Sequence, residues 1–283
     1  MHKNIHTFIG CDSDYEDSKM VIFGAPYDGT CSYRPGTRFA SAAIRNESYG
    51  IETFSPYQER DLLDYPIFDG GDLELPFGDP RRPLEMIEAM ESQLLEDGKL
   101  PIMIGGEHLV TLGAIRSVVK KYPDVHIIHF DAHADLRDDY LSVKLSHATV
   151  MRRCHELVGD HRIYQFGIRS GDREEFAWGK DHVTTCRFNF ETLSKVVVEL
   201  KEKQVPVYLT IDLDVLDPSV FPGTGTPEAG GVTFMELLNA IKEVSSLPII
   251  AADMNELSPT YDASGASTAV ACKLLRELLL LLA

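Results

Sequence analysis

Short apolar runs and longer segments of helical period alternate along the chain. The apolar runs, rich in β-branched residues, cover residues 20–25, 101–105, 125–130, 162–167, 206–211 and 247–251. The segments of helical period cover residues 83–95, 110–121, 190–203 and 234–244, and a mostly apolar closing helix is expected at 265–282. Strands that are apolar almost throughout are typical of a parallel sheet covered by helices on both faces. The pattern therefore predicts an α/β protein, a three-layer α/β/α sandwich with a central, mostly parallel sheet.

No feature of the sequence marks a domain boundary. It contains no linker rich in proline, glycine or serine, no low-complexity tract and no internal repeat. A chain of 283 residues with 44% hydrophobic residues can bury a sizeable core. We therefore expect residues 1–283 to form a single domain.

Charged and glycine-rich groups follow four of the apolar runs. These groups are Gly-Gly-Glu-His at 105–108, the segment 131–135, the segment 212–214 and the segment 253–256. In open α/β sheets, ligands bind beyond the carboxyl ends of the strands. We therefore expect the four groups to meet at one edge of the sheet.

The spacing of aspartate and histidine in these groups suits a metal site. Residues two apart on an extended segment point to the same side, so Asp131, His133 and Asp135 are expected to converge, as are the aspartates of 212–214. With His108 they form a mixed oxygen and nitrogen set, which favours manganese and leaves zinc, iron or cobalt open. Two cations about 3.5–4 Å apart would share a water molecule and lower its pKa. The alternative for each aspartate taken alone is that it caps the helix that follows.

Composition limits the partners and the setting. A formal charge of −17 and a pI near 4.9 disfavour nucleic acid and anionic membranes as partners. They favour cationic small molecules, although solubility alone also explains acidity. Five scattered cysteines without a Cys-x-x-Cys pair indicate a reducing, cytoplasmic setting. The leucine run at 278–282 is far shorter than the roughly 20 residues that span a bilayer, so we expect no membrane segment.

The motifs resemble those of a known family, the manganese-dependent ureohydrolases of the arginase and agmatinase group. The resemblance extends over almost the whole chain. It is carried by residues 33–38, 105–108, 129–135, 146–147, 210–218, 222–227 and 256–259. So many motifs in the same order are highly specific to this family, and the resemblance implies its arginase-like fold.

The resemblance implies a ligand set for two Mn²⁺ ions. One ion would be held by His108, Asp131, Asp135 and Asp212, and the other by Asp131, His133, Asp212 and Asp214. A hydroxide that bridges the ions would attack the guanidinium carbon of the substrate, and the tetrahedral intermediate would collapse to urea and an amine.

The resemblance also implies three catalytic side chains. Glu256 corresponds to the carboxylate that accepts paired N–H donors from the guanidinium group. Asp135 would relay a proton toward the leaving amine, and His147 corresponds to the proton-shuttle histidine. His129 and Asp131 are two residues apart, so on an extended strand their side chains point to the same face. His129 is therefore expected to be either a hydrogen-bond partner behind the site or an ordinary buried histidine.

Within the family, the motifs look most like those of agmatinases. Residues 136–145 lack the stretch rich in Asn and Ser/Thr that arginases use to bind the carboxylate of arginine. The expected reaction is hydrolysis of agmatine, a small cationic guanidino compound, to putrescine and urea. Asp138 or Asp139 is a candidate to offer negative charge to its distal amine, against the alternative that acidic loop residues are only solvated. For Glu228 the two interpretations are attraction of a cationic substrate tail and, preferred here, a solvated loop carboxylate. Asn255 precedes Glu256 and is expected to affect how that carboxylate is held.

Other functions stay open at this point. Within the family they are guanidinobutyrase or another guanidino-acid ureohydrolase, then arginase, or a catalytically silent homologue. A metal-dependent phosphoesterase would need basic groups near the site, and Arg137 and Lys144 are thin support for it. The resemblance finally implies a homo-oligomer, a trimer or a hexamer.

Overall fold

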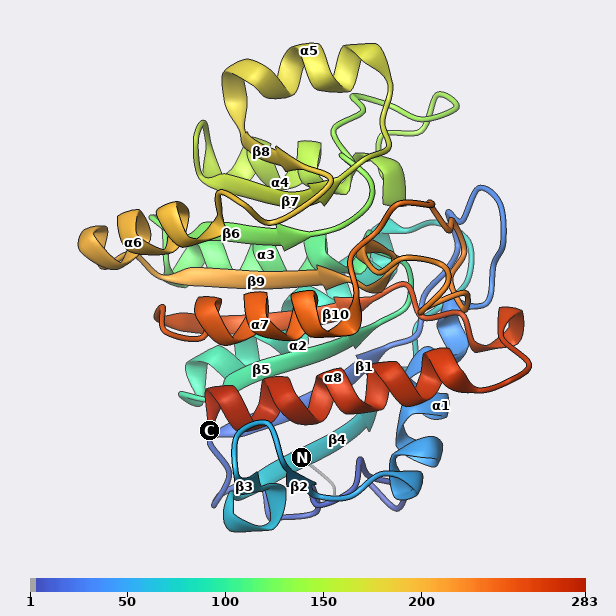
Figure 1. Ribbon diagram of the computed structural model, residues 1–283, viewed down its shortest axis with the longest axis vertical. Helices are drawn as coiled ribbons and strands as arrows, with labels where there is room; N and C mark the ends of the chain where they lie inside the picture. The colour runs from blue at the N-terminus through green and yellow to red at the C-terminus, as the bar shows by residue number, and fades with distance from the viewer. Residues whose placement is uncertain (1–3) are drawn as a thin grey trace.

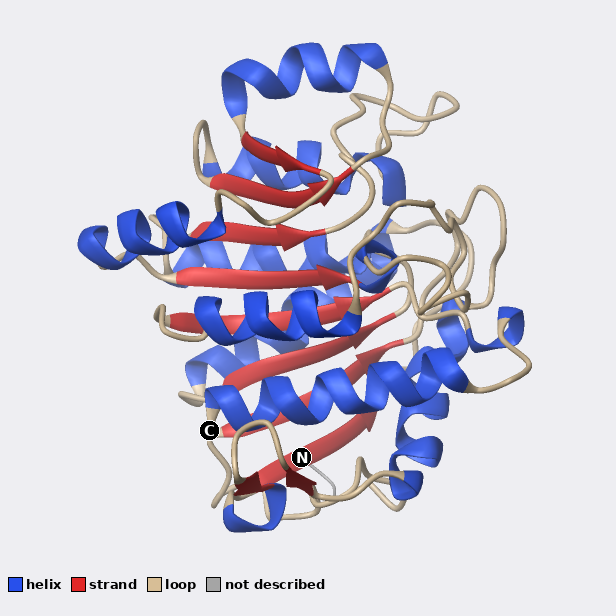
Figure 2. Cartoon of the chain, in the orientation of Figure 1, coloured by secondary structure: helices blue, strands red, loops and turns tan. Residues whose placement is uncertain are grey.

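The computed structural model describes residues 4–283, and an eight-stranded sheet lies at its centre (Figures 1 and 2). Its strands are β1 (Met20–Ala25), β4 (Ile67–Asp72), β5 (Leu100–Gly105), β6 (His126–Phe130), β7 (Ile163–Ile168), β8 (Thr184–Arg187), β9 (Val207–Asp212) and β10 (Ile249–Asn255). They lie in the order β4-β1-β5-β10-β9-β6-β7-β8, and each neighbouring pair is parallel. A separate antiparallel hairpin joins β2 (Phe54–Ser55) and β3 (Arg60–Asp61).

Helices cover both faces of the sheet. In Figure 1, α6 (Leu193–Lys203), α7 (Phe234–Val244) and α8 (Ala266–Leu282) lie in front, and α1 (Ala40–Glu47) packs against α8. Behind lie α2 (Arg81–Glu96), α3 (Val110–Lys121) and α4 (Val150–Val158), while α5 (Arg173–His182) packs near the edge strand β8. Short 3-10 helices are η1 (Thr37–Phe39), η2 (Ser48–Gly50), η3 (Leu62–Asp64), η4 (His147–Thr149), η5 (Leu213–Val215) and η6 (Pro259–Tyr261). The predicted three-layer sandwich is confirmed.

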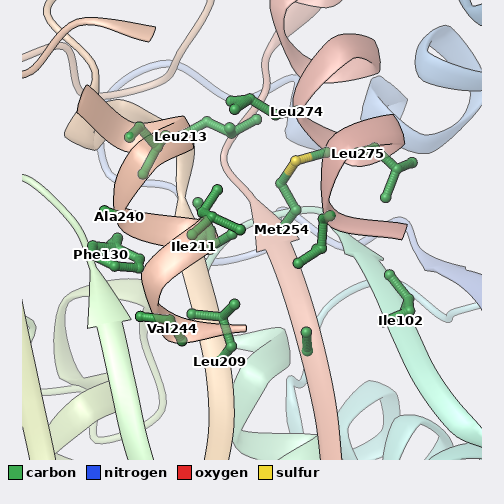
Figure 3. Packing of buried hydrophobic residues seen from close by; sticks show 14 of the residues in the cluster. Ile102, Phe130, Leu209, Ile211, Leu213, Ala240, Val244, Met254, Leu274 and Leu275 are labelled. Atoms are coloured by element: carbon green, nitrogen blue, oxygen red, sulfur yellow. The ribbon is translucent and has the colours of Figure 1, made fainter. Parts of the chain in front are cut away.

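The two cores explain why the central strands are apolar throughout. Successive side chains of a strand point to opposite faces. In β9, Leu209 and Ile211 join the core under α7 and α8, whereas Tyr208 joins the core on the other face. Figure 3 shows Leu209 and Ile211 beside Ala240 and Val244 of α7. A polar residue on either side of such a strand would lose its contact with water, so the pattern reads as a continuous apolar run.

The closing helix α8 is mostly buried, as the sequence predicted. Residues from Ser267 to Leu280 contribute eleven buried side chains. In Figure 1 the helix lies in front of β1 and β5. Within residues 4–283, none of the helices has both the length and the apolar character needed to cross a bilayer.

Candidate metal centre and active site

Four neighbouring strands deliver the predicted site residues to one edge of the sheet. β5, β10, β9 and β6 lie side by side in the centre of the sheet. His108 follows β5, Glu256 follows β10, Asp212 ends β9 and Asp131 follows β6. Because the strands are parallel, these carboxyl ends share one edge, and the expected meeting of the four groups is observed.

The segment after β6 converges by turning, not by alternating along an extended strand. Asp131 Oδ1 accepts a hydrogen bond from His133 N at 2.5 Å, which closes a tight turn directly after the strand. Asp135 has a φ of 54°, a left-handed conformation that costs free energy in a residue with a side chain. The prediction that residues 131–135 are extended was therefore wrong. Its consequence, that the side chains of Asp131, His133 and Asp135 come together, is observed.

Asp212 acts as a cap and also faces the site. Its Oδ1 accepts a hydrogen bond from Asp214 N at 2.8 Å, so it caps η5. Its Oδ2 lies 3.3 Å from His108 Nδ1. The two interpretations of this aspartate are thus compatible, because each uses a different carboxylate oxygen.

Around His108, three buried carboxylates surround one ring nitrogen. His108 Nδ1 lies 3.0 Å from Asp131 Oδ2 and 3.3 Å from the Oδ2 atoms of Asp135 and Asp212. This nitrogen is buried and makes no hydrogen bond among the described residues. The opposite nitrogen, Nε2, lies 2.8 Å from Thr210 Oγ1, which fixes the ring. A buried imidazole nitrogen left open toward three carboxylates fits the requirements of a divalent cation.

A second group lies beside the first and shares a member with it. His133 Nδ1 lies 2.9 Å from Asp214 Oδ2 and 3.5 Å from Asp131 Oδ1. Within residues 4–283, Asp131 belongs to both groups of ligand atoms that can hold an ion at this edge. Two adjoining ion sites with a shared carboxylate are the arrangement expected of a binuclear centre.

The crowding of carboxylates leaves the centre short of positive charge. Burial, and next the charge of Asp131, raise the pKa of Asp135 to about 7. Burial, and next the charges of Asp214 and Asp131, hold the pKa of Asp212 well above its ordinary value. Divalent cations would remove this repulsion. The residues present therefore fit a metal centre.

His129 lies behind the site as a partner of Asp131. Its Nε2 is 2.7 Å from Asp131 Oδ2, and Gln165 Nε2 donates to its Nδ1 at 3.1 Å. Because Nδ1 accepts, the ring hydrogen is on Nε2 and is donated to Asp131. Of the two expectations for His129, the structure matches the hydrogen-bond partner.

Glu256 is held in an unusual backbone conformation directly beside His108. Its φ is 68°, its amide donates to Gly106 O at 3.0 Å, and its Oε1 accepts from His108 N at 2.8 Å. Burial, and next the nearby Glu107, hold the pKa of this carboxyl well above its ordinary value. A cationic guanidinium group would supply the missing countercharge.

Asn255 points away from Glu256. Its Nδ2 donates to Asp253 Oδ1 at 2.7 Å and to Thr111 Oγ1 at 3.1 Å. A Cβ added at Gly105 would lie 1.8 Å from Asn255 Oδ1, so this close approach requires glycine on β5. Among the described residues no hydrogen bond joins the Asn255 side chain to the Glu256 carboxylate, so the expected influence of Asn255 stays a prediction that would have to act through the backbone of β10.

His147 is tied to a network that the sequence did not reveal. Its amide donates to Thr30 Oγ1 at 3.0 Å, and its Nε2 lies 3.1 Å from Ser32 Oγ. Thr30 Oγ1 in turn donates to Glu107 Oε1 at 2.6 Å, and Thr30 N donates to Glu107 Oε2 at 2.9 Å. Burial, and next the positive charge on His133, lower the pKa of His147 to about 4.

A cavity of about 200 Å³ opens onto the centre. It is lined by His133, Asp135, His147, Ser32, Tyr140, Arg137, Ser170, Glu175 and Thr226, among others. Arg137 Nη1 bonds to Asp172 Oδ2 at 2.6 Å, and its Nε lies 3.4 Å from Glu175 Oε2, so its charge is balanced. Glu175 was missed because its Asp-x-x-Glu spacing with Asp172 is also an ordinary helix capping box.

The other acidic loop residues lie in different places. Asp138 pairs with Arg153 at 2.8 Å, and Asp139 Oδ1 accepts from Ser142 N, so both face a neighbouring hollow and not the cavity itself. Glu228 is partly exposed, yet its Oε1 accepts from Ser170 Oγ at 2.9 Å and lies 3.8 Å from His133 Nε2.

Comparisons with known proteins identify the family of the chain. The model of the arginase family matches residues 18–281. The agmatinase of Bacillus subtilis strain 168 is 48% identical over 278 residues, which cover 96% of this chain and 95% of that protein. Many solved structures share the fold, among them the following two. One is a putative agmatinase from Clostridium difficile, with 49% identity, a TM-score of 0.91 and coverage of 95% of this chain and 98% of that chain. The other, the agmatine ureohydrolase of Thermoplasma volcanium, has 35% identity, a TM-score of 0.90 and coverage of 99% and 94%. The resemblance predicted from the motifs is confirmed, and the chain belongs to the arginase family of ureohydrolases.

Proposed function

We propose that this protein hydrolyses agmatine to putrescine and urea at a centre for two manganese ions. The observation that carries the proposal is the pair of adjoining ligand groups that share Asp131 at the carboxyl edge of the sheet. The similarity to agmatinases over almost the full chain supports the choice of agmatine.

The proposed ligands divide between the two ions. They are His108, Asp135, Asp131 and Asp212 for the first ion, and His133, Asp214, Asp131 and Asp212 for the second. When bound, the ions would supply a bridging hydroxide at neutral pH for attack on the guanidinium carbon. The mixed oxygen and nitrogen set is the reason to propose manganese.

Three side chains then position the substrate and move protons. Glu256 accepts N–H donors from the guanidinium group and holds its carbon toward the ions. Asp135 passes a proton toward the leaving amine. His147, which lines the cavity together with His133, carries protons between the site and solvent.

The rest of the proposal concerns the setting of the enzyme. The five free cysteines support a reducing, cytoplasmic location. The family resemblance is the reason to propose an assembly of three or six chains, and exposed aromatic side chains, including Phe77 and Tyr33, are available for contacts between chains. Light scattering coupled to gel filtration would give a mass of three or six times 31.6 kDa, and a monomer would contradict this assembly.

A urea-release assay on manganese-loaded protein tests the substrate. Agmatine, arginine, 4-guanidinobutyrate and 3-guanidinopropionate would be compared in parallel, with kcat/KM as the measured quantity. We expect agmatine to be the best substrate. A higher kcat/KM for arginine or a guanidino acid would overturn the choice of agmatine, and no urea from any of them would favour a catalytically silent homologue.

A further inference from the structure

Three side chains that can bind a metal ion meet at the amino ends of β7 and β8, which is the edge of the sheet opposite the candidate metal centre. His155 lies in the last turn of α4, Asp160 in the turn before β7, and His182 at the end of α5. β7 and β8 begin directly after these residues, whereas the metal centre lies beyond the carboxyl ends of the strands. The cluster is therefore roughly one strand length, ~17–20 Å, from that centre.

Backbone hydrogen bonds set Asp160 between the two histidines. Gly159 N donates to His155 O at 2.8 Å, and His161 N donates to His182 O at 2.8 Å. The residues on both sides of Asp160 are thus tied to the histidine backbones. Asp160 Oδ1 lies 2.8 Å from His155 Nε2 and 2.5 Å from His182 Nδ1. The three ligand atoms all lie within 4.8 Å of one another.

Aromatic packing holds the two imidazole rings in place. Trp178 stacks on His182, with ring centroids 4.2 Å apart and an angle of 18° between the planes. The ring of His155 meets Trp178 edge-on at 4.7 Å, and the guanidinium carbon of Arg152 lies 3.7 Å from the Trp178 centroid. Because the rings are already ordered, an ion that binds between them loses less affinity to side-chain ordering.

We propose that His155, Asp160 and His182 form a separate site for one divalent transition-metal ion, with Zn²⁺ as the representative ion. Two imidazoles and one carboxylate suit zinc and its neighbours better than calcium or magnesium. The side chains of Asp160 and His182 are 55% and 32% exposed, which leaves room for water to complete the coordination. The ion replaces the ring hydrogens that face Asp160, and each histidine keeps a hydrogen on its other nitrogen. The bound ion links α4, the turn that follows α4, and α5, close to the edge strand β8.

Zinc binding by matched variants tests the site. The full-length wild type, a His155→Ala/His182→Ala double variant and a His161→Ala control would be dialysed against Zn²⁺, and bound zinc counted by mass spectrometry. His161 is an exposed neighbour outside the cluster, so its variant controls for the loss of a surface histidine. We expect the double variant to bind one ion fewer per chain than the other two proteins. Its manganese-dependent urea release should equal that of the wild type.

A second measurement keeps the test independent of how the double variant folds. Crystals of the wild type soaked in zinc chloride should give an anomalous peak between the rings of His155 and His182, and crystals of Asp160→Asn a weaker peak. Equal zinc counts in all three dialysed proteins, or no peak at this position in the wild type, would identify a hydrogen-bonded cluster without an ion and overturn the proposal.

Discussion

At the residue scale, the site depends on which atom of each side chain faces the centre. His108 turns Nδ1 toward three carboxylates because Thr210 engages its Nε2, and Asp212 uses one oxygen as a cap and the other toward His108. Sequence spacing predicted which residues gather, because strand ends of a parallel sheet share one edge. It did not predict the hydrogen bond between Thr30 and His147. These residues are 117 positions apart, and a threonine in a loop gives no sign in the sequence of which distant residue it will contact.

Replacing Glu256 by glutamine removes its charge and keeps its shape. The amide oxygen can still accept the hydrogen bond from His108 N, but it binds a cationic guanidinium group more weakly. We expect kcat/KM for agmatine to fall about 100-fold in Glu256→Gln, with metal content unchanged. Steady-state urea release and metal analysis measure the two quantities. Glu236→Gln, which alters a capping residue on α7, is the control. If kcat/KM of Glu256→Gln lies within twofold of that control, Glu256 does not bind the guanidinium group as proposed.

At the element scale, the centre of the sheet was predictable and its edges were not. The pattern located the central strands within a few residues, because burial on both faces makes them apolar. It missed β8 (Thr184–Arg187), an edge strand in which only Cys186 is buried, and β4 (Ile67–Asp72), which ends in Asp-Gly-Gly-Asp. It also missed α5, because this helix fully buries only Glu175 and Gly179 and therefore lacks a clear periodic apolar face. The site was predictable because it lies on the central strands.

The loop after β1 positions His147 through the Thr30 hydroxyl. In Thr30→Val the hydroxyl that accepts from His147 N and donates to Glu107 is lost, while the side chain keeps its volume. One hydrogen bond contributes about 1 kcal/mol, so we expect kcat to fall about fivefold to tenfold while metal content stays constant. Thr30→Ser retains the hydroxyl and should stay near the wild-type rate. If valine and serine variants have the same kcat, Thr30 does not position His147.

At the scale of the whole molecule, net charge should influence encounter with the substrate. The chain carries a formal charge of −17, and agmatine is cationic. Salt screens this attraction over a Debye length of about 10 Å at 0.1 M. We therefore expect kcat/KM for agmatine to fall about threefold between roughly 0.05 M and 0.5 M sodium chloride. Glycine at equal osmolarity adds no net charge and serves as the control. A constant kcat/KM across the salt series would show that the field of the protein does not steer the substrate.

His126 should make the fold less stable in mild acid. Burial, and next the charge of Arg162, lower the pKa of this histidine to about 4, below the ordinary value near 6.5 that it has in the unfolded chain. Between those values the unfolded state binds more protons, so the free energy of unfolding falls as the pH drops from 6.5 to 4. Urea unfolding of metal-free protein measures the free energy of unfolding at pH 7 and pH 5. Its decrease between these two pH values should be about 1 kcal/mol larger in the wild type than in His126→Phe. Equal losses would contradict the buried, neutral state of His126.

The central claim is that two ions share Asp131 and Asp212, and the most direct test counts metal in Asp212→Asn. This change removes a negative charge from a shared ligand but retains the oxygen that caps η5, so the fold should persist. The exposed Asp17→Asn provides the matched control. After manganese loading and gel filtration, we expect two ions per chain and full urea release in the wild type and the control. We expect fewer ions and no measurable urea release in Asp212→Asn. Full metal occupancy with a near-normal rate in that variant would contradict the binuclear account.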